Sequence, residues 1–277
     1  MKETISLKRF KEAKLFIDAP YKDKPIILIF PGGGYHHIGE RETYPVSEKF
    51  LSYGYNTAIL FYSVYPYAYP TQLEEANDAV NYLKENFNKV YVLGFSAGGH
   101  LAGLVATKNK NVSAMFLSYP VVSFVNYVHQ GSVKHLLQDN ATLENKEKLS
   151  LENRVNKDTP PCFIWTCKTD ESVPYENTLM LVEALKKNNV FVEYKIFESG
   201  RHGMALADIS AIKDGDTSYV NDEVATWPNL LLEFIKKIES WRKDLWNISF
   251  FLLFVKKHIV LYLFLLFLSS LLTYLSV

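Results

Sequence analysis

The segment Gly94-Phe95-Ser96-Ala97-Gly98 places a serine between two glycines, directly after the apolar run Val90 to Leu93 and before a helix-like segment. A strand, a sharp turn and a helix in this order form a nucleophile elbow, which exposes a serine hydroxyl above a parallel sheet. Glycine suits positions 94 and 98 because the strand and helix backbones come close together there and the turn needs unusual backbone angles. The alternative is a serine in an ordinary structural turn, so the elbow predicts a nucleophile only if partner residues follow.

Two candidate partners lie downstream, and each comes just after a predicted strand. Asp170 is in the loop that precedes a predicted helix at Tyr175 to Lys187, and His202 lies between two glycines in a later loop. The chain order Ser, Asp, His is that of the α/β-hydrolases. We therefore predict that Ser96 attacks an acyl carbon, that His202 takes its proton, and that Asp170 orients the imidazole. The adjacent Glu171 is an alternative to Asp170.

A glycine run follows the apolar segment Ile26 to Phe30, well before the elbow. In lipases and esterases a backbone N–H from such a loop joins the N–H that follows the nucleophile to bind the developing oxyanion. This pattern predicts an oxyanion hole formed by Gly33 or Gly34 together with Ala97. A phosphate-binding loop is the competing interpretation, but the Lys-Ser/Thr ending of that motif is absent.

The rest of the chain alternates strand and helix patterns without an internal linker, which predicts one doubly covered, mostly parallel sheet in a catalytic domain over residues 1–245. A polar, irregular stretch at residues 126–158 is predicted to be a cap-like insertion over the site. It contains Tyr127, His129 and His135, whose places cannot be assigned from the sequence. The strands expected are Leu15–Ile17, Ile26–Phe30, Asn56–Phe61, Val90–Leu93, Ala114–Ser118, Cys162–Thr166 and Val190–Phe197.

Composition and residue spacing exclude several function classes. The 277 residues carry 30 basic and 30 acidic side chains, which is not the charge balance of a nucleic-acid binder. Cys162 and Cys167 stand at opposite ends of a predicted strand, too far apart for a disulfide, and are expected to be buried. No Cys or His spacing matches a zinc site, and Asp214-Gly215-Asp216 lacks the pattern of a calcium loop. We expect no metal and no cofactor.

Several motifs together resemble the acetyl-esterase and acetylxylan-esterase-like branch of the α/β-hydrolases, which is related to hormone-sensitive lipase. The resemblance runs from about Leu15 to about Ile238. It implies an enzyme that removes short acyl groups, often acetyl groups from sugars, with water as acceptor, without a cofactor, and with Ser96, Asp170 and His202 as its catalytic residues. The motifs are Pro31–Tyr35, Arg41-Glu42 with Pro45, Tyr62–Val64, Gly94–Ala102, Asp170–Pro174 and Gly200–Gly203.

The sequence leaves the substrate open. Tyr35 and His36 follow the glycines and are candidate substrate contacts, and Tyr35, Tyr62 and Tyr65 are consistent either with stacking on a sugar ring or with ordinary packing. Three functions remain: a hydrolase of small or carbohydrate esters, an oligopeptidase of the same fold, and an inactive membrane-associated binding module.

The chain continues past the expected domain into an apolar segment at residues 248–277, whose last nineteen residues contain no charge. This length reaches the lower end of what spans a bilayer, so we predict a C-terminal membrane anchor at 259–277. Lysines and arginines precede the segment, which predicts a cytoplasmic catalytic domain, and the first twenty residues do not look like a signal peptide. The alternatives are a hairpin lying in the membrane interface, a helix packed on the domain, and a non-native extension.

An anchor predicts that the full-length chain stays with membranes during carbonate extraction. Release of the full-length chain into the supernatant would contradict this prediction.

Overall fold

The computed structural model describes residues 1–7, 10–213 and 215–241, and the chain divides into two compact units, Met1–Leu231 and Leu232–Val277. The fold below is that of the first unit. The apolar segment 248–277 lies outside the described residues, so the predicted anchor remains a prediction. Among the described helices, none has the length and apolar character that crossing a membrane requires.

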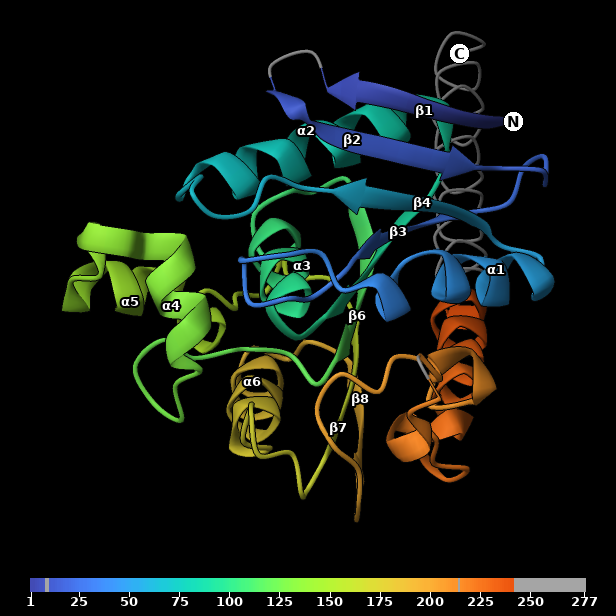
Figure 1. The fold of residues 1–277 in the computed structure, drawn as a ribbon. Helices are drawn as coiled ribbons and strands as arrows, with labels where there is room; N and C mark the ends of the chain where they lie inside the picture. Colours follow the sequence, from blue (N-terminus) through green and yellow to red (C-terminus); the bar gives the residue numbers. More distant parts are fainter. Residues whose placement is uncertain (8–9, 214, 242–277) are drawn as a thin grey trace, which may run out of the picture. The chain divides into compact units, whose positions relative to one another are not determined.

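The described strands form one eight-stranded sheet in the order β1-β2-β4-β3-β5-β6-β7-β8 (Figure 1). The first two pairs, β1 with β2 and β2 with β4, are antiparallel, and all later neighbours are parallel. The predicted mostly parallel sheet is therefore confirmed. The bounds are β1 Lys2–Leu7, β2 Phe10–Asp18, β3 Ile26–Phe30, β4 Asn56–Phe61, β5 Val90–Phe95, β6 Val112–Ser118, β7 Cys162–Cys167 and β8 Val192–Phe197.

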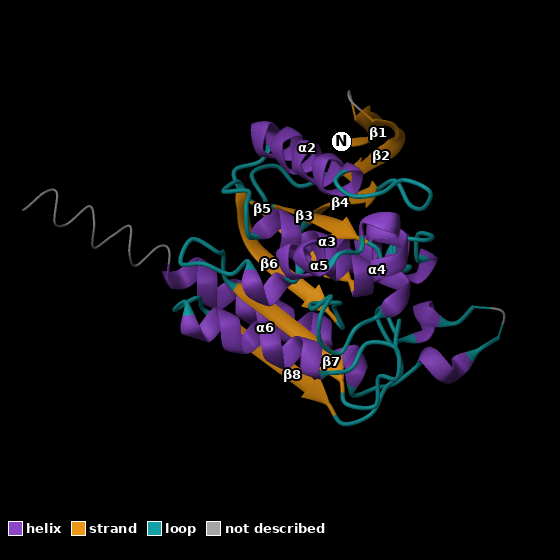
Figure 2. Cartoon of the chain, turned by 90° about the vertical axis from the view of Figure 1, so that its left-hand side faces the viewer, coloured by secondary structure: helices purple, strands orange, loops and turns teal. Residues whose placement is uncertain are grey.

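Helices cover both faces of the sheet. Figure 2 shows α2, α3 and α6 in front of the strands, and Figure 1 shows α1 on the opposite face. The α-helices of this unit are α1 Tyr44–Ser52, α2 Thr71–Asn86, α3 Ser96–Ala106, α4 Gln130–Leu137, α5 Leu143–Leu149 and α6 Glu176–Lys187. Residues 227–241 are also helical, and 232–241 of them belong to the second unit. Single 3-10 turns are η1 Glu40–Glu42, η2 Gln138–Asn140, η3 Leu151–Asn153, η4 Ile209–Ala211, η5 Thr217–Tyr219 and η6 Val224–Thr226.

The two faces of the sheet pack different side chains. Alternate residues of the central strands join an aliphatic core with α2, α3 and α6, for instance Leu28 and Ile164. The other residues meet aromatic rings beneath α1: Trp227 stacks on Trp165 with ring centroids 5.5 Å apart and also contacts Phe50 at 5.9 Å. Because the central parallel strands β3, β5 and β7 are buried on both faces, they appear in the sequence as largely continuous apolar runs, which is why they could be predicted.

The structure corrects two predictions. The single strand expected at Leu15–Ile17 is the longer β2, and β1 was missed because only alternate residues of this edge strand are sheltered and its other positions are polar. The insertion at 126–158 is not irregular, since it contains α4 and α5. The side chains of His129 and Thr142 accept backbone hydrogen bonds at the starts of these two helices. Cys162 and Cys167 are buried free thiols, as expected.

A buried histidine joins the glycine loop, the elbow helix and the cap insertion. His100 of α3 is fully buried; its Nδ1 lies 2.8 Å from the Tyr35 hydroxyl and its Nε2 lies 2.8 Å from the carbonyl oxygen of Leu149. Because a carbonyl can only accept, Nε2 carries the hydrogen and Nδ1 accepts from Tyr35. The ring also stacks on Phe124 at 4.4 Å. Burial lowers the pKa of His100 to about 3, so this ring is neutral at neutral pH.

This histidine makes stability depend on pH. Between its ordinary pKa of 6.5 and its folded value of about 3, the unfolded chain binds a proton that the folded chain does not. The free energy of unfolding therefore falls as pH falls through this window, by up to about 1.4 kcal/mol per pH unit from this one group. We predict that urea unfolding of the His100→Gln variant shows a shallower loss of stability from about pH 6 to about pH 4 than the unaltered protein. Equal slopes for the two proteins would contradict the prediction.

Candidate active site

Ser96 is the first residue of α3 and follows β5 without an intervening loop. Its φ of +52° lies in the left-handed region, which residues other than glycine rarely adopt. Such angles persist only where the surrounding structure holds the backbone in place. A Cβ on Gly94 would overlap the carbonyl oxygen of Gly98, and one on Gly98 would overlap that of Phe30. The predicted strand-turn-helix elbow is therefore confirmed, and both glycines are required by close approach of backbones.

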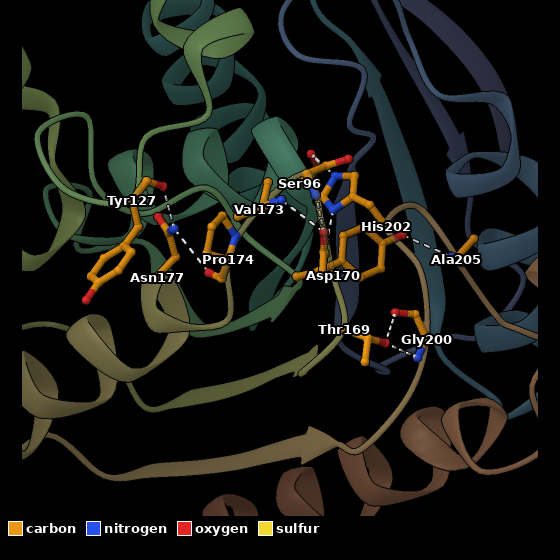
Figure 3. A network of polar contacts seen from close by, with 12 residues as sticks. Ser96, Tyr127, Thr169, Asp170, Val173, Pro174, Asn177, Gly200, His202 and Ala205 are labelled. Atoms are coloured by element: carbon orange, nitrogen blue, oxygen red, sulfur yellow. Dashed lines mark hydrogen bonds and ion pairs between the residues drawn. The ribbon is translucent and has the colours of Figure 1, made fainter.

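Ser96, His202 and Asp170 form one chain of hydrogen bonds (Figure 3). The Ser96 Oγ lies 2.7 Å from Nε2 of His202, and Nδ1 of His202 lies 2.7 Å from Oδ2 of Asp170. The second oxygen of Asp170, Oδ1, accepts the backbone N–H groups of Ser172 and Val173, both at 2.9 Å. These bonds fix the orientation of a carboxylate whose side chain is only 1% exposed.

This arrangement sets the hydrogen positions of the neutral histidine. An ionised carboxylate can only accept, so Nδ1 of His202 carries the hydrogen and donates it to Asp170. Nε2 is then free to accept from the Ser96 hydroxyl, which is the arrangement a general base needs. Asp170 makes this contact, whereas the alternative considered above, Glu171, lines the cavity beside the site.

The glycine loop after β3 lies against the same cavity as Ser96. Gly33 and Gly34 have φ values of +114° and +62°, and the carbonyl of Gly33 accepts the N–H groups of His36 and His37 at 3.0 and 3.2 Å. This tight turn leaves no room for a Cβ on Gly33, which would overlap the carbonyl of His37. The N–H of Ala97 belongs to the first turn of α3, where backbone donors have no partner within the helix.

The cavity has a volume of about 1310 Å³, and its lining is polar and apolar in equal measure. Its lining includes several basic or ionisable side chains from distant parts of the sequence. The predicted cap insertion contributes His129 and His135 to this lining. The other basic side chains of the lining are His36, His37, Arg41, Arg201, His202 and Lys213, and the acidic ones are Glu40, Glu42 and Glu171.

The structure corrects the expected substrate contacts. Tyr35 has no exposed surface, and its hydroxyl is taken up by His100, so the prediction that it touches substrate is wrong. Tyr62 is also buried and donates to the carbonyl of Pro31 at 2.6 Å. His36 does line the cavity, and its ring stacks against the half-exposed ring of Tyr65 at 6.3 Å.

Two polar residues at the site, Glu42 and Tyr119, received no role from sequence reasoning, although the Arg41-Glu42 pair was part of the family resemblance. Glu42 is 5% exposed, and its carboxylate accepts hydrogen bonds from the Gly32 N–H and the Tyr119 hydroxyl. Burial raises the pKa of Glu42, while these two hydrogen bonds, His202 and Arg41 lower it in part. The Arg41-Glu42 pair resembles an exposed charged turn in the sequence, and nothing local in it signals burial of the second residue.

Comparison with known proteins gives a family. The BD-FAE family model matches residues 15–185. The chain is 32% identical over 209 residues to endo-1,4-beta-xylanase B of Butyrivibrio fibrisolvens, covering 66% of this chain and 33% of that protein. It is 29% identical over 199 residues to an acetylxylan esterase of Xylanibacter ruminicola, covering 65% and 41%. The chain thus spans less than half the length of these two curated relatives.

Solved structures cover nearly the whole described unit. The carboxylesterase Cest-2923 of Lactobacillus plantarum aligns with a TM-score of 0.76 at 26% identity, over 86% of this chain and 98% of that one. An acetyl ester-xyloside bifunctional hydrolase of Caldicellulosiruptor lactoaceticus aligns with a TM-score of 0.72 at 36% identity, over 82% and 88%. With the family model matching more than half of its length, this chain belongs to the BD-FAE family, among the acetyl-esterase and acetylxylan-esterase-like α/β-hydrolases.

Proposed function

We propose that this protein is a serine carboxylic-ester hydrolase that removes short acyl groups, acetyl foremost, from a small or carbohydrate ester. The observation that carries the proposal is the continuous hydrogen-bond chain from Ser96 through His202 to Asp170 at the wall of an open cavity. The esterases among its relatives and structural neighbours support the reaction class.

The reaction follows from the hydrogen positions of these three residues. As Ser96 Oγ attacks the acyl carbon, its proton passes to Nε2 of His202, and the imidazolium is stabilised by Asp170. The same proton then goes to the oxygen of the departing alcohol, which leaves Ser96 acylated. In the second half, His202 takes a proton from water as the water oxygen attacks the acyl carbon. Return of that proton to Ser96 releases the carboxylic acid and restores the enzyme.

The oxyanion of each tetrahedral intermediate would be bound by the N–H of Ala97 and that of Gly33 or Gly34. Ala97 follows Ser96 in the chain, and Gly33 and Gly34 line the same cavity as Ser96. Such donors act only as negative charge develops, and loss of one typically costs about 3 to 4 kcal/mol of transition-state stabilisation.

The lining of the cavity favours a polar alcohol group over a long lipid chain. Histidines and charged side chains border it on the sides formed by the cap and the glycine loop. A sugar hydroxyl ester presents this kind of polar surface next to a small acyl group, and the acetylxylan esterase and the acetyl ester-xyloside hydrolase named above support this choice.

We further propose that the segment 259–277 anchors the domain on the cytoplasmic side of a membrane. The proposal rests on the lysines and arginines that precede this uncharged segment.

The proposed function is tested by hydrolysis of p-nitrophenyl acetate, butyrate and octanoate by the full-length chain. We expect turnover to fall steeply from acetate to octanoate and the Ser96→Ala variant to lose at least about 1000-fold in kcat, because the nucleophile is removed. Full activity in Ser96→Ala would refute the proposal. Faster turnover of a peptide amide than of the esters would favour an oligopeptidase, and failure of a fluorophosphonate to label Ser96 would favour a binding module.

The two adjacent carboxylates give a matched pair of variants. Asp170→Asn keeps the shape of the side chain but lets His202 adopt the wrong tautomer, and we expect kcat to fall by about 1000- to 10,000-fold. Glu171→Gln changes a cavity wall without touching His202 and is expected to leave kcat near that of the unaltered enzyme. Steady-state kinetics on p-nitrophenyl acetate measures both. The reverse ranking would show that Glu171 orients the histidine.

A further inference from the structure

The buried carboxylate of Glu42 lies between the two loops that carry the proposed reaction. On one side it reaches the glycine loop, where Oε2 accepts the N–H of Gly32 at 2.6 Å. On the other side Oε1 accepts the hydroxyl of Tyr119 at 2.7 Å. Gly32 directly precedes the two glycines proposed for the oxyanion hole, so this carboxylate is bonded to the backbone next to them.

Tyr119 extends the connection to the loop of His202. Its hydroxyl accepts the N–H of Ala205 at 2.9 Å, three residues beyond the histidine. Its ring meets the imidazole edge-on with centroids 5.0 Å apart. A continuous buried path therefore runs from Gly32 through Glu42 and Tyr119 to the loop of His202.

The surroundings of Glu42 are shaped for this carboxylate. A Cβ on Gly39 would lie 2.7 Å from Oε2, and one on Gly32 would lie 2.9 Å from it, so both positions must be glycine for the side chain to enter. Both of its polar neighbours, the Gly32 N–H and the Tyr119 hydroxyl, donate to it, which is the pattern that an ionised carboxylate accepts. A negative charge held here also favours the positive imidazolium that forms at His202 during the reaction.

We propose that Glu42 is a positioning residue that fixes the position of the oxyanion loop relative to the loop of His202. The inference rests on the proposed esterase function and adds a determinant of its geometry. Glu42 acts through Gly32 and Tyr119, and takes no part in bond making. Its loss should therefore weaken stabilisation of the transition state more than binding of the ester.

The test compares Glu42→Gln with Glu75→Gln. Glu75 is a second buried carboxylate that accepts a backbone N–H and a hydroxyl, both from Ser63, at 2.8 and 2.5 Å, and it is absent from the cavity lining. Each amide can accept only one of the two donors, so both variants lose a comparable interaction in the fold. Tyr119→Phe is the second variant at the site, since it keeps the ring against His202 and removes the hydroxyl.

For p-nitrophenyl acetate we expect Glu42→Gln to lower kcat by about 10- to 100-fold, part of the loss typical of a missing oxyanion donor, with little change in KM. Affinity for a trifluoromethyl ketone, which forms a tetrahedral adduct with Ser96, should fall by the same factor as kcat/KM. Tyr119→Phe should behave similarly, and the double variant should lose less than the product of the two single losses. Glu75→Gln should lower thermal stability without this kinetic loss.

The outcomes separate this inference from the function on which it rests. An unaltered protein without Ser96-dependent ester turnover would remove the proposed function itself. Active unaltered protein with undiminished kcat in Glu42→Gln and Tyr119→Phe would overturn the positioning role. Equal kinetic losses in Glu42→Gln and Glu75→Gln would also overturn it, because they would indicate a general effect on the fold.

Discussion

The close approach of three backbone segments at Gly98 sets the geometry of the whole site. Only a hydrogen atom fits where Gly98 faces the carbonyl oxygens of Phe30 and Pro31, so α3 begins directly against the end of β3. This contact turns Ser96 out of β5 with a left-handed φ. It also places Ala97 beside the glycine loop that follows β3. The nucleophile and the proposed oxyanion donors thus depend on one packing constraint between parallel strands and the helix that crosses them.

The glycine loop after β3 needs hydrogen bonds from other parts of the chain, because its positive φ angles and tight turn are unfavourable by themselves. Three buried side chains from elsewhere in the chain make these hydrogen bonds. Tyr62 donates to the carbonyl of Pro31, Glu42 accepts from Gly32, and the hydroxyl of Tyr35 donates to His100. Each of these groups is hydrogen-bonded in the buried interior, where an unpaired polar atom would be costly. The polar core around the site therefore works as a rigid frame for a loop without regular structure.

The fold and the cluster of Ser96, Asp170 and His202 could be predicted from the sequence because both are signalled by patterns within short stretches of the chain. Continuous apolar runs mark strands buried on both faces, and Ser96 and Asp170 each come just after one of them, whereas His202 follows the partly exposed edge strand β8. Tyr35 shows where this reasoning fails. A tyrosine beside three glycines resembles an exposed loop residue, but its hydroxyl finds His100, 65 positions later in the chain. Glu42 was missed for the same reason, since its partner Tyr119 is 77 residues away.

The central claim is that Ser96 and the glycine loop together bind a tetrahedral intermediate. The most direct measurement is a crystal structure of the protein after reaction with a small alkyl fluorophosphonate. The account predicts phosphorus bonded to Ser96 Oγ, with its phosphonyl oxygen about 2.7 to 3.1 Å from the N–H nitrogens of Ala97 and of Gly33 or Gly34. An adduct on Ser96 whose oxygen points away from the glycine loop would contradict it.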